Sequence, residues 1–115
     1  MDEDKLLETL KLSLRVDGEE DDEILKRNIS AAKSYVIGAI GYDDGIMTGF
    51  YELADIKDQF EMVVIAIASS YYTYRSAIVG NAVSEVDLVS YSIIGQLRGK
   101  YIDLEQRGGV NGSKN

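Results

Sequence analysis

The stretch from Ile56 to Val79 constrains the fold most, because its apolar side chains recur at helical spacing for about six turns. One stripe steps by three or four residues and consists of Ile56, Phe60, Val64, Ile67, Tyr71, Tyr74 and Ile78. These steps place the side chains along one face of an α-helix, while Met62, Val63 and Ile65 lie on its other faces. A helix that is apolar on several sides needs neighbours on several sides, either from its own chain or from another copy.

Two alternatives to a central helix fail on length. The run from Met62 to Ala68 is rich in β-branched residues, which favour strands. A strand would end at turn residues within about eight positions, whereas here the helical phase continues to Ile78. A membrane-spanning helix needs about 20 apolar residues, and this run is too short.

The rest of the chain predicts an all-α fold, a small bundle of about four helices around the central one. Apolar residues at helical spacing predict the other helices at Asp4–Leu14, Ile24–Ile40 and Ser84–Leu104. The second of these turns inward a clean apolar stripe of Leu25, Ile29, Ala32, Val36 and either Ala39 or Ile40. We expect one domain over residues 1–107, followed by a disordered tail at 108–115 because Gly, Asn, Ser and Lys dominate there.

A long glycine-containing loop from Gly41 to Ala54 separates the second and third helices. It also holds apolar residues, among them Phe50 and Tyr51, which either fold back on the core or stay available to a partner. The core is favoured for the loop as a whole, and Phe50 and Tyr51 remain candidates for an interface. Gly38, inside the preceding helix, weakens that helix unless another backbone passes close to it.

The segment between the first two helices is a turn followed by a run of acids. We expect Gly18 to supply the left-handed backbone that ends the first helix, and Asp21 or Asp22 to cap the second. An EF-hand alternates its oxygen ligands and places glycine sixth, whereas these acids are consecutive, so a calcium loop is not predicted. The candidate helix-start and turn residues are Arg15, Asp17, Asp21 and Asp22.

Several residue types are missing, and their absence excludes common chemistry. The 115 residues include no His, Cys or Pro, so a zinc site of the usual kind, a Ser-His-Asp triad and a thiol nucleophile cannot be built. No disulfide framework or signal peptide is indicated, and synthesis in the cytoplasm is the expectation. No cofactor is expected.

The charge is acidic and unevenly distributed. The net charge is -8; residues 1–61 hold 16 acids and 7 bases, and residues 62–115 hold 4 acids and 5 bases. A module that binds duplex DNA would show a basic face, and no basic cluster exists in this sequence. Independent binding to nucleic acid or to an anionic membrane is therefore not expected.

No arrangement of residues points to catalysis. The acids crowd at helix starts rather than standing as a pair on an apolar face, and Lys33 or Lys57 are the only conceivable bases. A metal-dependent enzyme using Asp17, Glu20 and Asp21 is kept as a rival hypothesis.

The second half of the central helix changes character, with hydroxyls, tyrosines and one arginine. Rings and a guanidinium could stack nucleic-acid bases. The favoured interpretation is that Tyr71 and Tyr74 continue the core stripe, whereas Tyr72 and Arg75 lie nearer its edge. Amphipathic rings and planar cations are typical of protein interfaces, so Tyr72 and Arg75 are candidate interface residues.

The order of these elements resembles the head-tail connector family of tailed phages and prophages, which are small all-helical head-completion proteins. The resemblance covers roughly residues 5–104. It is carried by Leu10-Lys11-Leu12-Ser13-Leu14-Arg15-Val16-Asp17, Glu20-Asp21-Asp22-Glu23, Ala31-Ala32-Lys33-Ser34-Tyr35-Val36, Tyr71-Tyr72-Thr73-Tyr74-Arg75 and Leu97-Arg98. The loop at 41–54 and the glycines Gly95 and Gly99 of the last helix depart from that pattern.

The resemblance implies a non-enzymatic ring adaptor in the virion, at the junction of head and tail. Its implied partners are other copies of itself, the portal protein and a downstream connector or tail protein, with DNA passing non-specifically through the channel and no membrane involved. A small helical dimer that acts as a regulatory or partner-binding module is the other rival, because the same surplus of apolar helix surface would suit it.

Overall fold

The computed structural model describes residues 3–77 and 84–111, without the side chains of 74–77 and 84–88. These residues form four α-helices and two short 3₁₀ helices and include no strand: α1 Glu3–Leu14, α2 Asp22–Ile40, η1 Gly45–Met47, η2 Phe50–Glu52, α3 Ala54–Ala77 and α4 Ser84–Gln106. The all-α prediction is confirmed, and each predicted helix is present with shifts of a few residues at its ends. The sequence also predicts a break between the last two helices at Gly80-Asn81-Ala82, and these three residues lie outside the described ones.

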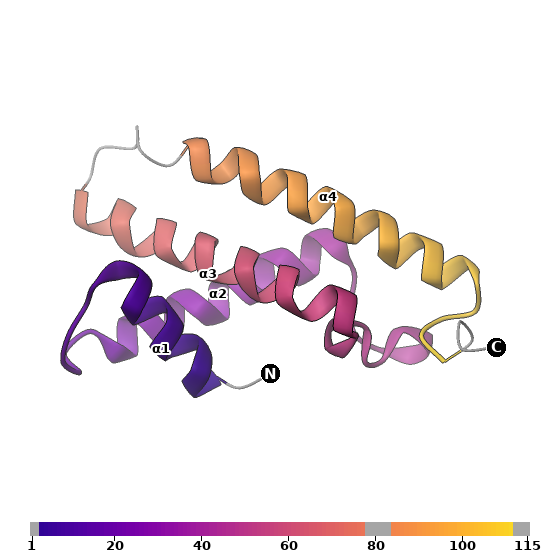
Figure 1. Ribbon diagram of the computed structural model, residues 1–115, viewed down its shortest axis with the longest axis horizontal. Coiled ribbons are helices and arrows are strands. Elements are labelled where there is room, and N and C mark those ends of the chain that lie inside the picture. The colour runs from indigo at the N-terminus through magenta and orange to yellow at the C-terminus, as the bar shows by residue number, and fades with distance from the viewer. Residues whose placement is uncertain (1–2, 78–83, 112–115) are drawn as a thin grey trace.

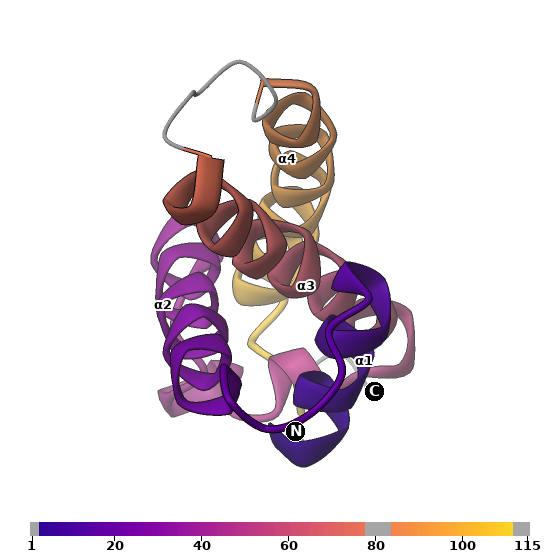
Figure 2. The ribbon, with the colours of Figure 1, turned by 90° about the vertical axis from the view of Figure 1, so that its left-hand side faces the viewer.

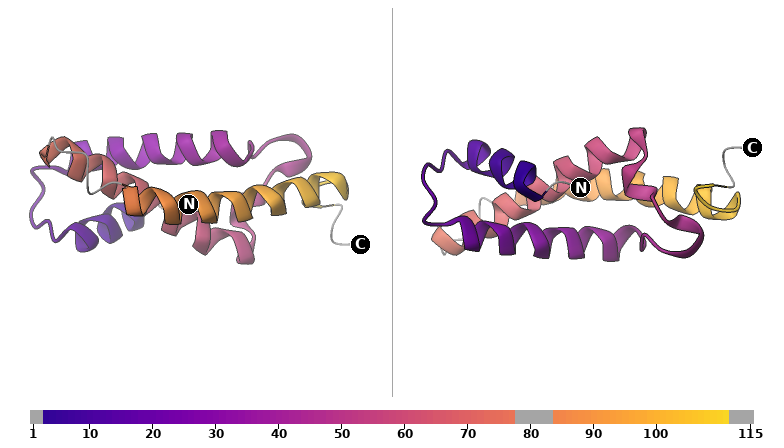
Figure 3. Two further views of the ribbon diagram at one scale, coloured as in Figure 1. Left: turned by 90° about the horizontal axis from the view of Figure 1, so that it is seen from above. Right: turned by 90° about the horizontal axis from the view of Figure 1, so that it is seen from below.

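Helix α3 runs through the middle of an elongated molecule of 48 × 28 × 18 Å (Figure 1). Helix α4 lies along one side of it, antiparallel, and α1 and α2 lie on the other sides (Figure 2). Seen from below, α1 and α2 are on opposite sides with α3 between them (Figure 3). Within the described ranges, no helix is long and apolar enough to cross a membrane.

The core forms where the apolar stripes of these helices meet. From α3 it takes Ile56, Phe60, Val63, Val64, Ile67 and Ala68. From α2 it takes Leu25, Ile29, Ala32, Val36 and Ile40, as the spacing predicted. Helix α1 adds Leu6, Leu7 and Leu10, and α4 adds Ile94, Leu97 and Tyr101. Short helices such as α1 are marginal alone, so this docking stabilises them.

The buried face of α3 shifts in the second half of that helix, and one prediction is corrected there. Tyr71 was expected in the core, but its side chain is 38% exposed. Tyr72, expected at the edge, is half-buried and packs against the core from its margin. The buried line continues from Val64 through Ala68 to Tyr72, in steps of four, because this end of α3 faces the start of α2.

The loop between α2 and α3 folds back on the core, as its apolar content predicted. Met47, Phe50 and Tyr51 are each at most 3% exposed. The Tyr51 hydroxyl donates a hydrogen bond to the Gly41 carbonyl oxygen at 2.6 Å. Gly41 ends α2 as its C-cap residue, with its amide bonded to the Ile37 carbonyl at 2.8 Å.

The start of the expected tail is part of the fold, which corrects the boundary predicted at residue 107. Gly108 has a φ of +104°, and the Gly109 amide reaches back to the Leu104 carbonyl at 2.8 Å, so α4 ends in a Schellman motif. The Val110 side chain is buried, and its amide donates to the Ile46 carbonyl at 2.8 Å. Val110, which follows the glycine turn, is therefore part of the core. Residues 112–115 lie outside the described range.

Candidate assembly surface

The four candidate interface residues occupy different environments. Phe50 and Tyr51 are core residues, so their side chains are not available on the surface of this chain. Tyr72 is half-buried, and Arg75 lies in α3 with its side chain outside the described atoms. The exposed apolar residues of the loop are instead Tyr42 and Ile46, at 65% and 57%. The loop therefore does expose apolar surface, but Tyr42 and Ile46 provide it rather than the predicted Phe50 and Tyr51.

Arg15 rather than Gly18 provides the left-handed residue that ends α1. Its φ is +58°, and the amides of Arg15 and Val16 bond to the Leu12 and Lys11 carbonyls at 3.2 and 2.9 Å, which is again a Schellman motif. Gly18 also has a positive φ, of +81°, three residues later within the turn. Val16 packs against the core at this point, and its position after Arg15 explains why the turn occurs there.

Asp21 and Asp22 stand at the start of α2, as predicted, but neither side chain caps it. Asp21 is the N-cap residue and makes no side-chain cap hydrogen bond. Its carboxylate instead accepts a hydrogen bond from the Tyr72 hydroxyl at 2.5 Å. Asp22 forms an ion pair with Lys11 of α1 at 2.8 Å. These two carboxylates therefore tie α2 to α3 and to α1.

The rival metal site finds no support in the geometry. Nowhere in residues 3–77 and 84–111 do three Asp or Glu side chains come together in a way that could hold a metal ion. Asp17 and Glu20 point into solvent, and Asp21 is engaged by Tyr72. Lys33, one conceivable base, pairs with Glu3 at 2.5 Å.

Burial shifts the ionisation of two tyrosines beside the loop. The pKa of Tyr51 is raised above its ordinary value of 10.0, first by desolvation and then by the nearby charges of Tyr101 and Asp43. The pKa of Tyr101 is raised as well, again mainly by burial. Both hydroxyls donate to backbone carbonyls, and the Tyr101 hydroxyl reaches the Tyr42 carbonyl at 2.8 Å. These two hydrogen-bonded rings fix the loop in place.

Large apolar side chains are exposed on each of the four α-helices of the described chain and in the loop between α2 and α3. They are Leu12, Tyr35, Tyr42, Ile46, Met62, Tyr71, Val89, Tyr91 and Ile102. Most were not singled out from the sequence, because periodicity gives the buried face but not which outward residues stay uncovered. The sequence did contain a signal for Met62, because this residue lies off the core stripe of a helix that is apolar on several sides.

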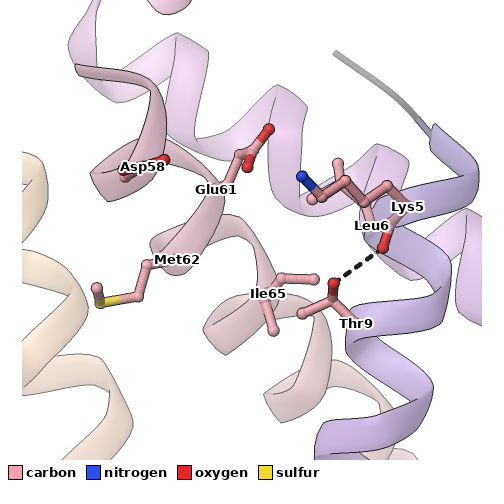
Figure 4. A pocket seen from close by; sticks show the side chains of 7 residues that line it. All are labelled: Lys5, Leu6, Thr9, Asp58, Glu61, Met62 and Ile65. Carbon is pink, nitrogen blue, oxygen red and sulfur yellow. Dashed lines mark hydrogen bonds between the residues drawn. The ribbon is translucent and has the colours of Figure 1, made fainter. Parts of the chain in front are cut away.

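One of these side chains borders a groove of about 290 Å³ between α1 and α3 (Figure 4). Lys5, Leu6 and Thr9 line it from α1, and Asp58, Glu61, Met62 and Ile65 line it from α3. In the close-up, Glu61 points into the space between the two helices, and Met62 extends away from α1. Met62 is 58% exposed. We name this feature the α1/α3 groove; it is a largely apolar hollow with the carboxylates of Asp58 and Glu61 at its edge.

The opposite side of the molecule is formed by the outer face of α2. Its exposed side chains and glycine are Lys26, Arg27, Ser30, Ala31, Ser34, Tyr35, Gly38 and Ala39, which we name the outer α2 face. No acid occurs from residue 24 to residue 42 of this otherwise acidic chain. Lys26 and Arg27 make no ion pair with the described residues. The lack of acids was readable in the sequence and was overlooked there.

Comparison with known proteins identifies the family of this chain. Residues 4–98 match the family described as phage gp6-like head-tail connector protein. No curated protein and no solved structure matched the chain. The match spans nearly all of the four helices described above and agrees with the resemblance seen in the sequence. This chain therefore belongs to the phage gp6-like head-tail connector family, and its role is that of a structural component of the virion.

Proposed function

We propose that the chain is a non-enzymatic subunit of an oligomeric ring that sits between portal and tail and extends the DNA channel of the virion. Membership of the connector family carries this proposal. The partners are other copies of the chain, the portal protein and a downstream connector or tail protein. The subunit is made in the cytoplasm of the bacterial host and ends up at the head-tail junction.

The charge of the chain supports a channel through which DNA passes without being held. The net charge is -8, so a wall built from many copies is strongly negative at neutral pH. Such a wall repels phosphates, whereas a DNA-binding protein neutralises them with Lys and Arg. We therefore expect DNA to move along the channel wall without sequence-specific contacts.

The uncovered apolar side chains support assembly with other proteins. Leu12, Met62, Val89 and Tyr91 are each at least 58% exposed, and they belong to three different helices. Exposed apolar surface on several sides suits a subunit with neighbours on several sides. Arg75 and the loop side chains Tyr42 and Ile46 are further candidates for contacts with those neighbours.

Light scattering over a concentration series, together with electron microscopy of the chain mixed with the portal protein of its own phage, tests this proposal. We expect rings of many copies, either free or stacked on the portal. A defined dimer that leaves the portal bare would favour the regulatory module instead. A strict monomer that ignores the portal in both measurements would contradict the ring.

A further inference from the structure

We propose that neighbouring copies join head to tail, with the outer α2 face of one copy seated in the α1/α3 groove of the next. This inference rests on the proposed ring and names the two surfaces that would build it. The occupant of the groove is thus a second copy of this chain, and the contact brings together two different faces of the same protein.

Charge complementarity is the first argument. Lys26 and Arg27 are exposed on the outer α2 face and have no ion-pair partner in the described chain. On the rim of the groove, Asp58 and Glu61 likewise have no ion pair with any described residue. Two unpaired cations on one side and two unpaired anions on the other suit each other across an interface, and like faces would repel.

The shape of the outer α2 face is the second argument. Between Arg27 and Gly38 its exposed positions are mostly small, with Ser30, Ala31 and Ser34 beside Tyr35. A methyl group added at Gly38 would meet nothing within 4 Å, so no contact inside the chain requires glycine there. Glycine weakens a helix interior relative to alanine. Close approach by a neighbouring copy gives this exposed glycine, in the last turn of α2, a reason.

The two faces also match in length. Arg27 and Tyr35 are eight residues apart, or about 12 Å along α2, and Asp58 and Ile65 are seven residues apart, or about 10 Å along α3. With the cations against Asp58 and Glu61, the small residues and Tyr35 then cover Met62. That contact would remove from water a methionine that is 58% exposed in the single chain.

The two faces are placed as a ring requires. Helices α1 and α2 lie on opposite sides of α3 (Figures 2 and 3), and in Figure 4 α2 passes behind the groove. A subunit whose two complementary faces point in different directions binds one neighbour with each face, so every added copy leaves one face free for the next. Such heterologous contacts generate closed rings when the rotation between copies closes.

Charge reversal with rescue tests the pairing, scored as the concentration at which half the chain is assembled. Lys26→Glu/Arg27→Glu alone, and Asp58→Lys/Glu61→Lys alone, should each raise that concentration by about tenfold or more. Combining all four changes in one chain should restore assembly. Glu105→Lys on α4 is the matched control and should assemble like the original. Circular dichroism confirms that each variant keeps its helices.

Disulfide trapping gives a second readout, without background because the chain has no cysteine. Ser34→Cys/Met62→Cys should give a ladder of cross-linked multimers on oxidation with the portal present, and Ser34→Cys/Gln96→Cys should not. If the original chain forms rings while the charge variants assemble normally and no ladder appears, this pairing is wrong and the ring stands. If the original chain forms no ring at all, both proposals fall.

Discussion

The Tyr72 hydroxyl donates a hydrogen bond to the Asp21 carboxylate at 2.5 Å and joins residues 51 positions apart in the chain. It ties the second half of α3 to the residue that precedes α2. Both residues were candidates from the sequence, Tyr72 for an interface and Asp21 for a helix cap. Their contact shows that each serves first to fix the packing of the subunit.

Removal of the Tyr72 hydroxyl should therefore destabilise the chain. Tyr72→Phe keeps the aromatic side chain but leaves the half-buried Asp21 carboxylate without this hydrogen-bond donor. We expect the free energy of unfolding to fall by about 1.5–2 kcal/mol. Urea denaturation followed by circular dichroism measures the change. Tyr71→Phe, at the exposed neighbouring position, should change stability by less than about 0.5 kcal/mol. Equal losses from the two variants would refute the role given to this hydrogen bond.

Alanine substitutions at Gly38 and Gly41, which lie three residues apart, should change the stability of the chain in opposite directions. A methyl group at Gly41 would lie 2.3 Å from the Tyr101 ring, at a φ of +149°. We expect Gly41→Ala to destabilise the chain by about 3 kcal/mol, from overpacking and backbone strain together.

Gly38→Ala meets open space in the last turn of α2, where alanine still favours the helix over glycine, so it should stabilise the single chain by about 0.5 kcal/mol. Thermal and urea unfolding of both variants, at a concentration where the chain is unassembled, make the comparison. Destabilisation by Gly38→Ala under these conditions would mean that a contact within the chain had been missed.

Strong alkali should unfold the chain through its buried tyrosines. The pKa of Tyr51 is raised in the folded state, so folding keeps its proton. The stabilising effect is complete below the unfolded-state pKa of 10.0 and is lost as the pH rises toward the folded-state value. The free energy of unfolding, measured by urea titration between pH 8 and pH 11, should therefore fall above about pH 10.

Tyr51→Phe removes one titrating group from this pH dependence. It should be less stable at pH 8, because the hydrogen bond to Gly41 is lost, and its stability should fall less steeply above pH 10. An unchanged slope would show that other groups cause the alkaline loss.

The segment after α4 gives a truncation test. A chain ending at Arg107 loses the buried Val110 side chain and its hydrogen bond to Ile46, and should be destabilised by about 2 kcal/mol. A chain ending at Asn111 keeps both contacts and should match the full chain. Differential scanning calorimetry of the two truncated chains decides between this account and a tail that begins at residue 108.

The sequence was a good guide where burial is continuous along a helix. The stripe from Ile56 to Ile67 and the inward face of α2 were predicted because each residue in them touches the same core. The phase shift from Tyr71 to Tyr72 was not, because it depends on where the start of α2 lies against α3. Periodicity within one helix contains no information about the position of another.

The sequence was also a poor guide to the conformation of single residues at the turns. Gly18 was the natural choice to end α1, yet Arg15 adopts the left-handed conformation because Val16 must reach the core directly after it. Val110 follows a pair of glycines in a polar segment and was assigned to the tail, although its burial orders that segment. In each case one apolar contact outweighed the local preference of the backbone.

Electron microscopy of the chain bound to the portal of its own phage, with the rotational symmetry determined from the images, tests the central claim most directly. We predict one coaxial ring of copies related head to tail, with a channel continuous with that of the portal. Copies arranged as two-fold dimers, or a portal left bare at saturating concentrations of the chain, would contradict it.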